Sequence, residues 1–220
     1  MEVYIVILLF LLFMSCVFFF FRKSSKYISL RKKIRALKKE RRFKRALSDM
    51  KSILDQHEQH FFLVCGTFLG QFRDAKFIPH DVDIDIGVLR KTFDVDLKNK
   101  ILNTKKFTLV HELGRLEDSY EISFLHVGGA RVDIFLYYEI STDYYYHATF
   151  FGICEEKEGG FCKLASHIRG FRDVLFYGEN YQAPVNAEEY LVELYGDDFM
   201  TPREFDYHDG LDWGYKDLIN

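Results

Sequence analysis

Apolar and polar residues alternate in the segment 81–86, which reads Asp-Val-Asp-Ile-Asp-Ile. Side chains alternate between the two faces of a β-strand, so Asp81, Asp83 and Asp85 share one face and the apolar residues between them share the other. This segment is therefore expected to be a strand with one buried apolar face and a row of carboxylates on its opposite face.

Other stretches predict further elements on both sides of this strand. Apolar positions at helical spacing predict a helix over 43–59, and a helix-like run covers 68–74. Further helices are expected over 92–103 and 186–195, and strands over 61–64, 107–113, 120–127, 130–138 and 144–151. Together they predict one α+β domain over 46–220 with a mixed sheet and flanking helices.

The N-terminal residues 3–21 form an apolar run of 19 residues that only Ser15 and Cys16 interrupt, with Tyr4 at one edge. This length matches the hydrocarbon core of a bilayer, and the run lacks the cleavage site of a signal peptide. We therefore expect a single transmembrane anchor over 1–21 that attaches the protein to a membrane through residues 3–21. A buried core helix is the alternative.

Charge divides the remainder of the chain into two parts. Of the 30 Lys and Arg residues, 13 fall in residues 22–45, and of the 33 acidic residues only Glu2 and Glu40 precede residue 46. Residues 46–220 therefore carry 17 basic and 31 acidic residues, a formal net charge of −14. We expect 22–45 to be a basic stalk that either contacts anionic headgroups or is simply a solvated linker. Nucleic-acid binding is not expected, because the domain is anionic.

The aspartate row has a chemical consequence. Like charges on one face of a strand raise each other's pKa unless a cation lies between them. Hard oxygen ligands suit Mg²⁺ or Mn²⁺, which usually bind through one or two carboxylates together with the phosphates of a substrate. The residues just upstream fit such a substrate, since Gly66 and Thr67 precede a helix whose start can bind an anion, and Arg73 can form two hydrogen bonds to a phosphate.

The segment Gly-Thr-Phe-Leu-Gly-Gln-Phe-Arg-Asp-Ala-Lys-Phe-Ile-Pro-His-Asp-Val-Asp-Ile-Asp-Ile, residues 66–86, resembles the signature of the LicD/fukutin family. That signature usually reads Gly-Thr/Ser-Leu-Leu-Gly-x-x-Arg and then Phe-Ile-Pro-Trp-Asp-x-Asp-x-Asp-Ile. His80 stands where the family usually has Trp. Residues 131–135 are similar to the strand that carries the third carboxylate of the nucleotidyltransferase fold, and residues 190–198 to the family's terminal Leu-Tyr-Gly element.

The resemblance, which covers roughly residues 45–215, implies a nucleotidyltransferase-like fold and a metal-dependent phosphotransferase. It implies metal binding by Asp81, Asp83, Asp85 and Asp133, with Asp83, Asp85 and Asp133 as catalytic residues. The implied donor is a CDP-linked alcohol of the ribitol phosphate or phosphocholine type, and the implied acceptor is a hydroxyl on a glycan or glycoprotein. From the residues alone, Asp133 could equally be the partner of Arg131.

Two other functions stay open at this stage. A catalytically inactive relative could act as a partner or scaffold in glycosylation, although such a protein is expected to have lost a metal carboxylate. A nucleotidyltransferase could use a protein or RNA acceptor.

The cellular compartment is also open. The resemblance implies a Golgi or secretory-pathway membrane with a lumenal domain, whereas the basic stalk after the apolar run favours a cytosol-facing domain.

The four cysteines allow few inferences. Cys154 and Cys162 have a spacing that suits a disulfide at the tip of a hairpin if the domain is lumenal. A zinc site that combines them with His147 or His167 is a further alternative. Free thiols are the default expectation, and Cys65 beside Gly66 is expected to be a small buried side chain.

Overall fold

The computed structural model describes residues 25–151 and 160–202, together with isolated positions near the N-terminus (4, 7, 10, 11, 14 and 15). The chain divides into two compact units, Met1–Arg41 and Arg42–Asn220. Helix α2 (Ser25–Gln56) begins in the first unit and ends in the second. In the first unit the described apolar side chains of this helix, Leu30, Ile34 and Leu37 among them, are exposed.

The predicted transmembrane helix has to be corrected. Most of residues 3–21 lie outside the described part of the chain, and no helix of the described residues is both long and apolar enough to cross a bilayer. Helix α2 has sufficient length, with 32 residues, but it is rich in Lys and Arg, and charged side chains are costly in a bilayer. For the described residues, this finding contradicts the predicted anchor over 1–21 and the predicted single-pass membrane protein, with either a lumenal or a cytosol-facing domain.

The second unit contains a mixed β-sheet, and the predicted α+β class is confirmed for this unit. The strands of the sheet are β1 (Phe62–Leu63), β2 (Asp83–Leu89), β3 (Phe107–Leu113), β4 (Glu121–His126), β5 (Arg131–Ser141), β6 (Tyr144–Phe151) and β7 (Gly160–His167). Strands β2 and β5 are parallel, and the other pairs are antiparallel. Strand β5 is central, because it pairs with β2, with β4 over 131–135 and with β6 over 137–141.

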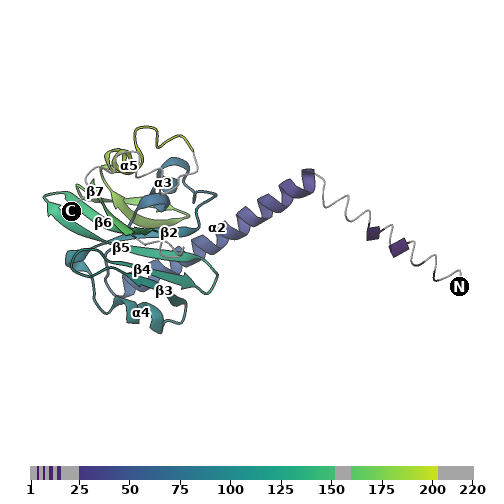
Figure 1. Ribbon diagram of the computed structural model, residues 1–220, viewed down its shortest axis with the longest axis horizontal. Helices are drawn as coiled ribbons and strands as arrows, with labels where there is room; N and C mark the ends of the chain where they lie inside the picture. Colours follow the sequence, from purple (N-terminus) through teal and green to yellow (C-terminus); the bar gives the residue numbers. More distant parts are fainter. Residues whose placement is uncertain are drawn as a thin grey trace. The chain divides into compact units, whose positions relative to one another are not determined.

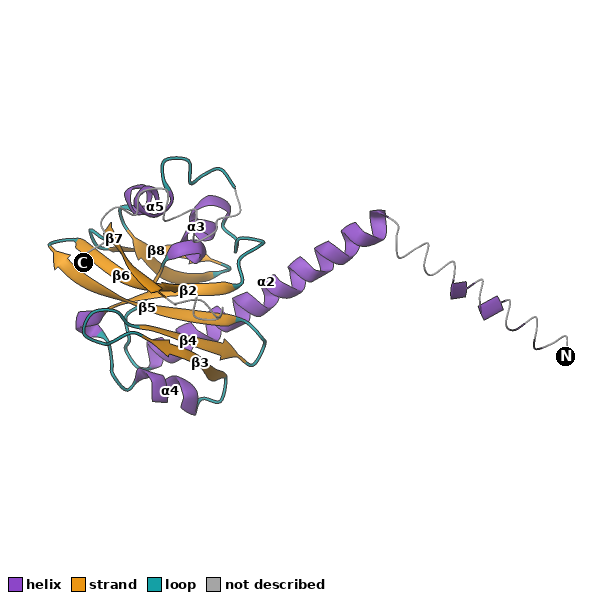
Figure 2. Ribbon diagram, in the orientation of Figure 1, coloured by secondary structure: helices purple, strands orange, loops and turns teal. Residues whose placement is uncertain are grey.

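Helices lie on both sides of the strands (Figures 1 and 2). Helices α3 (Cys65–Asp74) and α5 (Ala187–Tyr195) lie together on one side, and α4 (Leu97–Asn103) lies on the other, next to β3. A short 3₁₀ helix, η1 (Arg90–Thr92), follows β2, and a separate hairpin consists of β8 (Phe171–Phe176) and β9 (Glu179–Pro184).

The register of β2 and β5 separates an apolar face from a polar one. Ile84 and Ile86 in β2, and Val132 and Ile134 in β5, are fully buried on one face. The opposite face of the same two strands presents aspartates, because Asp85 is paired with Asp133. Burial of the aliphatic residues holds both strands in register, since a shift by one residue would turn the aspartates into the core.

Candidate active site

A cavity of about 280 Å³ lies on the polar face of the sheet, between the strands and helices α3 and α5. Helix α3 contributes Cys65, Gly66, Leu69 and Arg73, and the loop before β2 contributes Ile78, His80, Asp81 and Val82. The sheet contributes Asp83, Asp85, Phe135, His147, Thr149 and Leu164, and the C-terminal part of the unit contributes Leu194, Tyr195, Phe199 and Thr201.

Three aspartates converge at the β2 side of this cavity. Asp83 and Asp85 project from β2 and Asp133 from the adjacent strand β5, and one carboxylate oxygen of each lies within 4.8 Å of the other two. Asp85 and Asp133 are buried, whereas Asp83 is half-buried. The sequence places Asp83 and Asp85 on one face of a strand, the resemblance adds Asp133, and the parallel pairing of β2 with β5 brings the three together.

Two neighbouring side chains hold these aspartates. Arg131 forms an ion pair with Asp83, and its Nε atom lies 3.1 Å from Asp133 Oδ2. The Ser123 hydroxyl on β4, which is fully buried, donates a hydrogen bond to Asp133 Oδ1. Asp133 therefore has a partner on each side, and the Arg131–Asp133 pair that the sequence left open is present.

The aspartate cluster holds more negative charge than Arg131 offsets. Burial raises the pKa of Asp85 well above its usual value, and Asp83 and Asp133 raise it further. Burial also raises the pKa of Asp133 to about 6, although Arg131 acts in the opposite direction. Such shifts arise where carboxylates are buried and share a site without enough positive charge between them.

This arrangement fits a divalent cation. Several carboxylate oxygens converge, which is the ligand type that Mg²⁺ and Mn²⁺ prefer, and the cavity leaves room for phosphate oxygens beside them. Asp81 lies in the loop just before β2 rather than in the strand, but its Oδ2 approaches the same place, next to Gly66. The predicted metal site stays a prediction, one that the charge and the donor set of these residues fit.

Of the three residues predicted to bind phosphate, two line the cavity and one does not. Gly66 lines the cavity, and a Cβ at this position would lie only 2.6 Å from Asp81 Oδ2. Arg73 also lines the cavity, where its Nε atom lies 2.9 Å from Asp74 Oδ2. Thr67 is buried and is not among the lining residues; its Oγ1 accepts a hydrogen bond from the Asp85 N–H (2.8 Å) and so ties α3 to β2.

Some residues near the aspartates were not found from the sequence. Glu121 on β4 is buried, and its pKa is raised to about 8 by burial and by Asp133. His111 on β3 lies 3.3 Å from Glu121. Glu121 and Ser123 fall two residues apart in a predicted strand, so their shared face was the available signal; their proximity to Asp133 depends on the pairing of β4 with β5.

The cavity also contains a cysteine and a histidine in contact. Cys65 Sγ lies 3.9 Å from His147 Nε2. Burial raises the pKa of the Cys65 thiol well above its usual value and lowers the pKa of His147 to about 3, so both groups are neutral at physiological pH. Cys65 is half-buried rather than fully buried, and it is a free cysteine.

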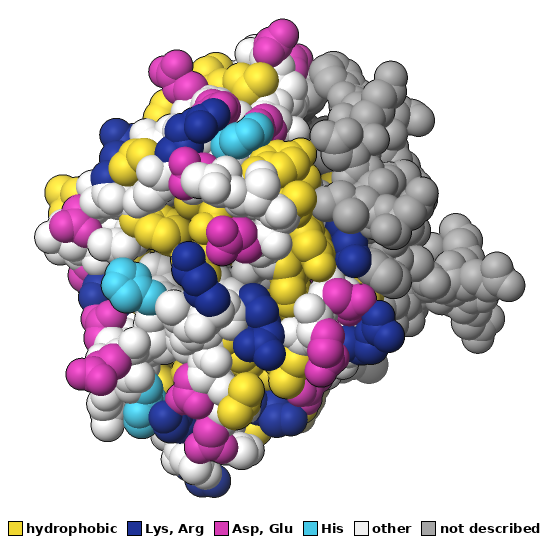
Figure 3. Space-filling view, turned by 90° about the vertical axis from the view of Figure 1, so that its left-hand side faces the viewer, with side chains coloured by type: hydrophobic (Ala, Val, Ile, Leu, Met, Phe, Trp, Pro, Cys, Tyr) yellow, Lys and Arg dark blue, Asp and Glu magenta, His cyan; other side chains and the backbone are white. Residues whose placement is uncertain are grey.

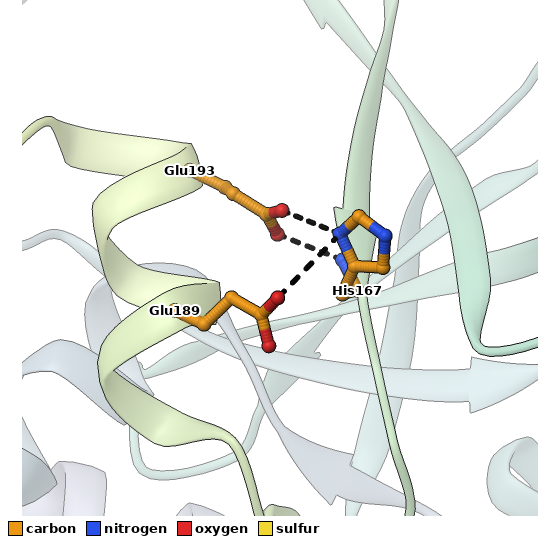
Figure 4. A group of neighbouring side chains, drawn as sticks. All are labelled: His167, Glu189 and Glu193. Carbon is orange, nitrogen blue, oxygen red and sulfur yellow. Dashed lines mark hydrogen bonds and ion pairs between the residues drawn. The ribbon is translucent and has the colours of Figure 1, made fainter.

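A second group of titratable side chains lies where α5 meets β7 (Figure 4). Glu189 and Glu193, on one face of α5, both point toward His167 at the end of β7. The carboxylate of Glu193 accepts hydrogen bonds from His167 N–H (2.7 Å) and pairs with His167 Nδ1 (2.6 Å), while Glu189 forms a two-pronged ion pair with Arg169. Each of these side chains has its hydrogen-bond partners within the group. We therefore interpret the contact of Glu193 with His167 as a structural link between α5 and β7, and call it the clasp.

Two predictions from the sequence, the disulfide and the zinc site, involve cysteines that are not among the described residues lining this cavity. Cys154 and the side chain of Cys162 lie outside what the structure describes, so the predicted disulfide and zinc site stay predictions. Figure 3 shows one face of the molecule, on which acidic and basic side chains are intermixed.

The comparisons with known proteins agree with the geometry of this site. Residues 58–186 match the family model described as LicD/FKTN/FKRP, nucleotidyltransferase domain. Human ribitol-5-phosphate transferase FKTN is 30% identical over 145 residues, which cover 64% of this chain and 30% of FKTN. The Macaca fascicularis protein of the same name is 31% identical with the same coverage. An uncharacterised protein of Caenorhabditis elegans is 34% identical over 96 residues, which cover 42% of this chain and 25% of that protein.

The chain therefore spans about a quarter to a third of the length of these curated relatives. The family match includes Gly66 of α3, the aspartates of β2 and the third aspartate on β5. Since it extends over more than half of the sequence, the chain belongs to the LicD/FKTN/FKRP family of nucleotidyltransferase domains.

Proposed function

We propose that this protein is a metal-dependent phosphotransferase that moves a phospho-alcohol from a CDP-linked donor to a hydroxyl of a glycan. The observation that carries the proposal is the convergence of Asp83, Asp85 and Asp133 in a cavity, with ligand atoms within 4.8 Å of one another. The names of the FKTN relatives support the reaction class, because they describe a ribitol-5-phosphate transferase.

The aspartates have distinct roles in this proposal. Asp83, Asp85 and Asp133 would hold one or two Mg²⁺ or Mn²⁺ ions, with Asp81 as an accessory ligand. A bound ion of this kind supplies positive charge that offsets the charge of the phosphate oxygens. Raised pKa values of Asp85 and Asp133 support this assignment, since positive charge among them would offset the burial, and the repulsion between carboxylates, that raise the values.

The donor diphosphate would lie beside α3. Gly66 lets it approach the backbone closely, and Arg73 offers a guanidinium at the cavity wall. Arg73 would exchange its contact with Asp74 for the phosphate, since that contact joins neighbouring residues at a helix end. Thr67 acts indirectly in this arrangement, by fixing the backbone of Asp85.

The reaction needs one bond to form and one to break. The acceptor oxygen bonds to the phosphorus that carries the alcohol, the bond from that phosphorus to the bridging oxygen breaks, and CMP leaves. Asp133 accepts the hydroxyl proton. Its burial and its two partners, Ser123 and Arg131, hold the carboxylate in a fixed position for this task.

The decisive experiment uses the full chain with Mn²⁺ and a panel of CDP-, UDP- and GDP-linked donors, and it measures nucleoside monophosphate release. We expect release from a CDP-linked alcohol, and loss of release by at least about a hundredfold in the Asp83→Asn/Asp85→Asn double variant. Asp173→Asn is the matched control, because Asp173 is an exposed carboxylate on β8, away from the cavity.

Circular dichroism and thermal unfolding establish that the double variant is folded. Full activity in a folded double variant would contradict the proposal. Binding of no nucleotide by the folded wild-type chain would instead favour a catalytically inactive relative that acts through protein partners.

A further inference from the structure

The cavity changes character across the sheet. At β2 it presents the aspartates, whereas at β6 and β7 its described lining consists of His147, Thr149 and Leu164, next to Phe135 on β5 and Leu194 on α5. We call this second part the β6–β7 side. All five side chains there are uncharged at neutral pH, because burial keeps His147 neutral.

One buried polar atom of this lining lacks a partner, and a second such atom lies on the neighbouring strand. His147 is 1% exposed, and its Nδ1 has no hydrogen-bond partner among the described residues. The Oγ of Ser166, which is fully buried on β7 and is not among the residues that line the cavity, likewise has no partner among the described residues. Register pairs His147 with Leu164 and Tyr145 with Ser166, so His147 and Ser166 lie diagonally on one face. Buried polar atoms are rarely left unpaired, and a ligand or ordered water usually satisfies them.

The walls limit which part of a donor can lie here. A polyol would bury several hydroxyl groups, and each hydroxyl that found no partner would cost free energy. A heteroaromatic ring instead needs apolar surfaces on its faces and a few polar groups at its edge, which matches Phe135, Leu164 and Leu194 around His147 and Thr149. The cavity of about 280 Å³ also has room for one ring and its neighbouring groups rather than for a whole nucleotide-linked alcohol.

We propose that the β6–β7 side of the cavity binds the pyrimidine base of the donor nucleotide, and that His147 and Thr149 select that base. A neutral imidazole and a hydroxyl can each donate and accept a hydrogen bond, as the edge of a pyrimidine requires. This inference rests on the proposed function, since it assigns one part of the same donor to one part of the same cavity. The alcohol then extends from the diphosphate away from the β6–β7 side.

The experiment measures binding to the full chain in Mn²⁺ by titration calorimetry, with CDP, ADP and inorganic pyrophosphate as probes. Pyrophosphate has no base, so it reports on the metal and phosphate part alone. Wild-type protein is expected to bind CDP at least about tenfold more tightly than pyrophosphate or ADP. Thr149→Val, which keeps the side-chain shape, and His147→Gln are each expected to weaken CDP about fivefold to tenfold and leave pyrophosphate unchanged.

Thr108→Val on the exposed edge strand β3 is the matched control and should bind both probes as wild type does. Should His147→Gln fail to fold, the nearly isosteric Thr149→Val still decides the question. Equal binding of CDP and pyrophosphate, or wild-type CDP binding by a folded Thr149→Val variant, would overturn the base site and leave the proposed function standing. Failure of every probe to bind, with metal present, would overturn both.

Discussion

Gly66 is the residue on which the geometry of the phosphate end of the cavity depends most directly. A Cβ there would lie 2.6 Å from Asp81 Oδ2 and 3.5 Å from Asp85 Oδ2. In Gly66→Ala the carboxylate of Asp81 has to move, while the backbone of α3 can stay in place because alanine favours helix. We expect unchanged or slightly raised thermal stability and about tenfold weaker Mn²⁺ binding, measured by calorimetry.

Gly70→Ala is the matched comparison on the same helix. A Cβ at Gly70 would lie 2.4 Å from the backbone oxygen of Lys76, and a backbone atom cannot move aside as a side chain can. This variant should therefore unfold at a lower temperature, in contrast to Gly66→Ala. Equal loss of stability in the two variants would show that Gly66 serves the fold rather than the site.

At this scale the sequence predicted the aspartates but not their surroundings. Asp83 and Asp85 were recognisable because two-residue spacing places them on one face of a strand, whichever strand lies beside them. Ser123 and Glu121 acquire their meaning only from the pairing of β4 with β5, which no local pattern specifies. Thr67 was predicted to bind phosphate because it follows Gly66 at the start of a helix. Only the structure reveals that its hydroxyl accepts a hydrogen bond from the Asp85 backbone instead.

At the scale of elements, α5 is the piece that closes the cavity. Leu194 and Tyr195 at its end line the cavity, and the clasp of Glu193 with His167 fixes the helix to β7. Glu193→Gln keeps the size of the side chain but replaces one carboxylate oxygen by an amide NH₂ group, which leaves a single accepting oxygen for the two contacts with His167. We expect unfolding free energy to fall by about 1–2 kcal/mol, together with faster hydrogen exchange in 187–195.

Glu188→Gln is the control for this prediction, because Glu188 lies on the same helix but is exposed. Both variants lose one negative charge, so a difference between them reports the clasp rather than net charge. Unchanged hydrogen exchange in Glu193→Gln would mean that packing of Tyr190 and Leu191, which are fully buried, holds α5 without the clasp.

Elements were predictable where their pattern was strong. The predicted bounds of β3 and β6 agree with the structure, and α5 begins within one residue of its predicted start. The hairpin of β8 and β9 was not predicted, because its strands are short and its turn depends on left-handed backbone at Tyr177 and Gly178, of which only the glycine is a recognisable signal. The predicted helix over 92–103 is observed only as α4, over 97–103, while Thr92 at its predicted start ends η1.

At the scale of the whole molecule, the buried carboxylates set the dependence of stability on pH. The folded-state pKa values of Asp85, Asp133 and Glu121 are all raised, to about 6 for Asp133 and about 8 for Glu121. The folded state then binds more protons than the unfolded state between about pH 4 and 8, so stability falls as pH rises through this range. His147 acts oppositely: its lowered pKa means that stability also falls as pH drops below about 6.5.

Metal-free protein should consequently be most stable at mildly acidic pH, and Mn²⁺ should stabilise it most where the carboxylates would otherwise repel one another. Because the metal binds the deprotonated carboxylates and competes with protons, the rise in melting temperature on adding Mn²⁺ is expected to be larger at pH 8 than at pH 5.5. Thermal unfolding from pH 4.5 to 8.5, with and without Mn²⁺, measures both effects.

The Asp83→Asn/Asp85→Asn variant is the control for this prediction. In this variant the metal-dependent rise in melting temperature should disappear, and the metal-free protein should lose less stability toward pH 8. An equal rise with Mn²⁺ in wild type and variant would place the metal elsewhere on the chain, whereas a pH-independent rise in the wild type alone would mean that these carboxylates are already ionised without it.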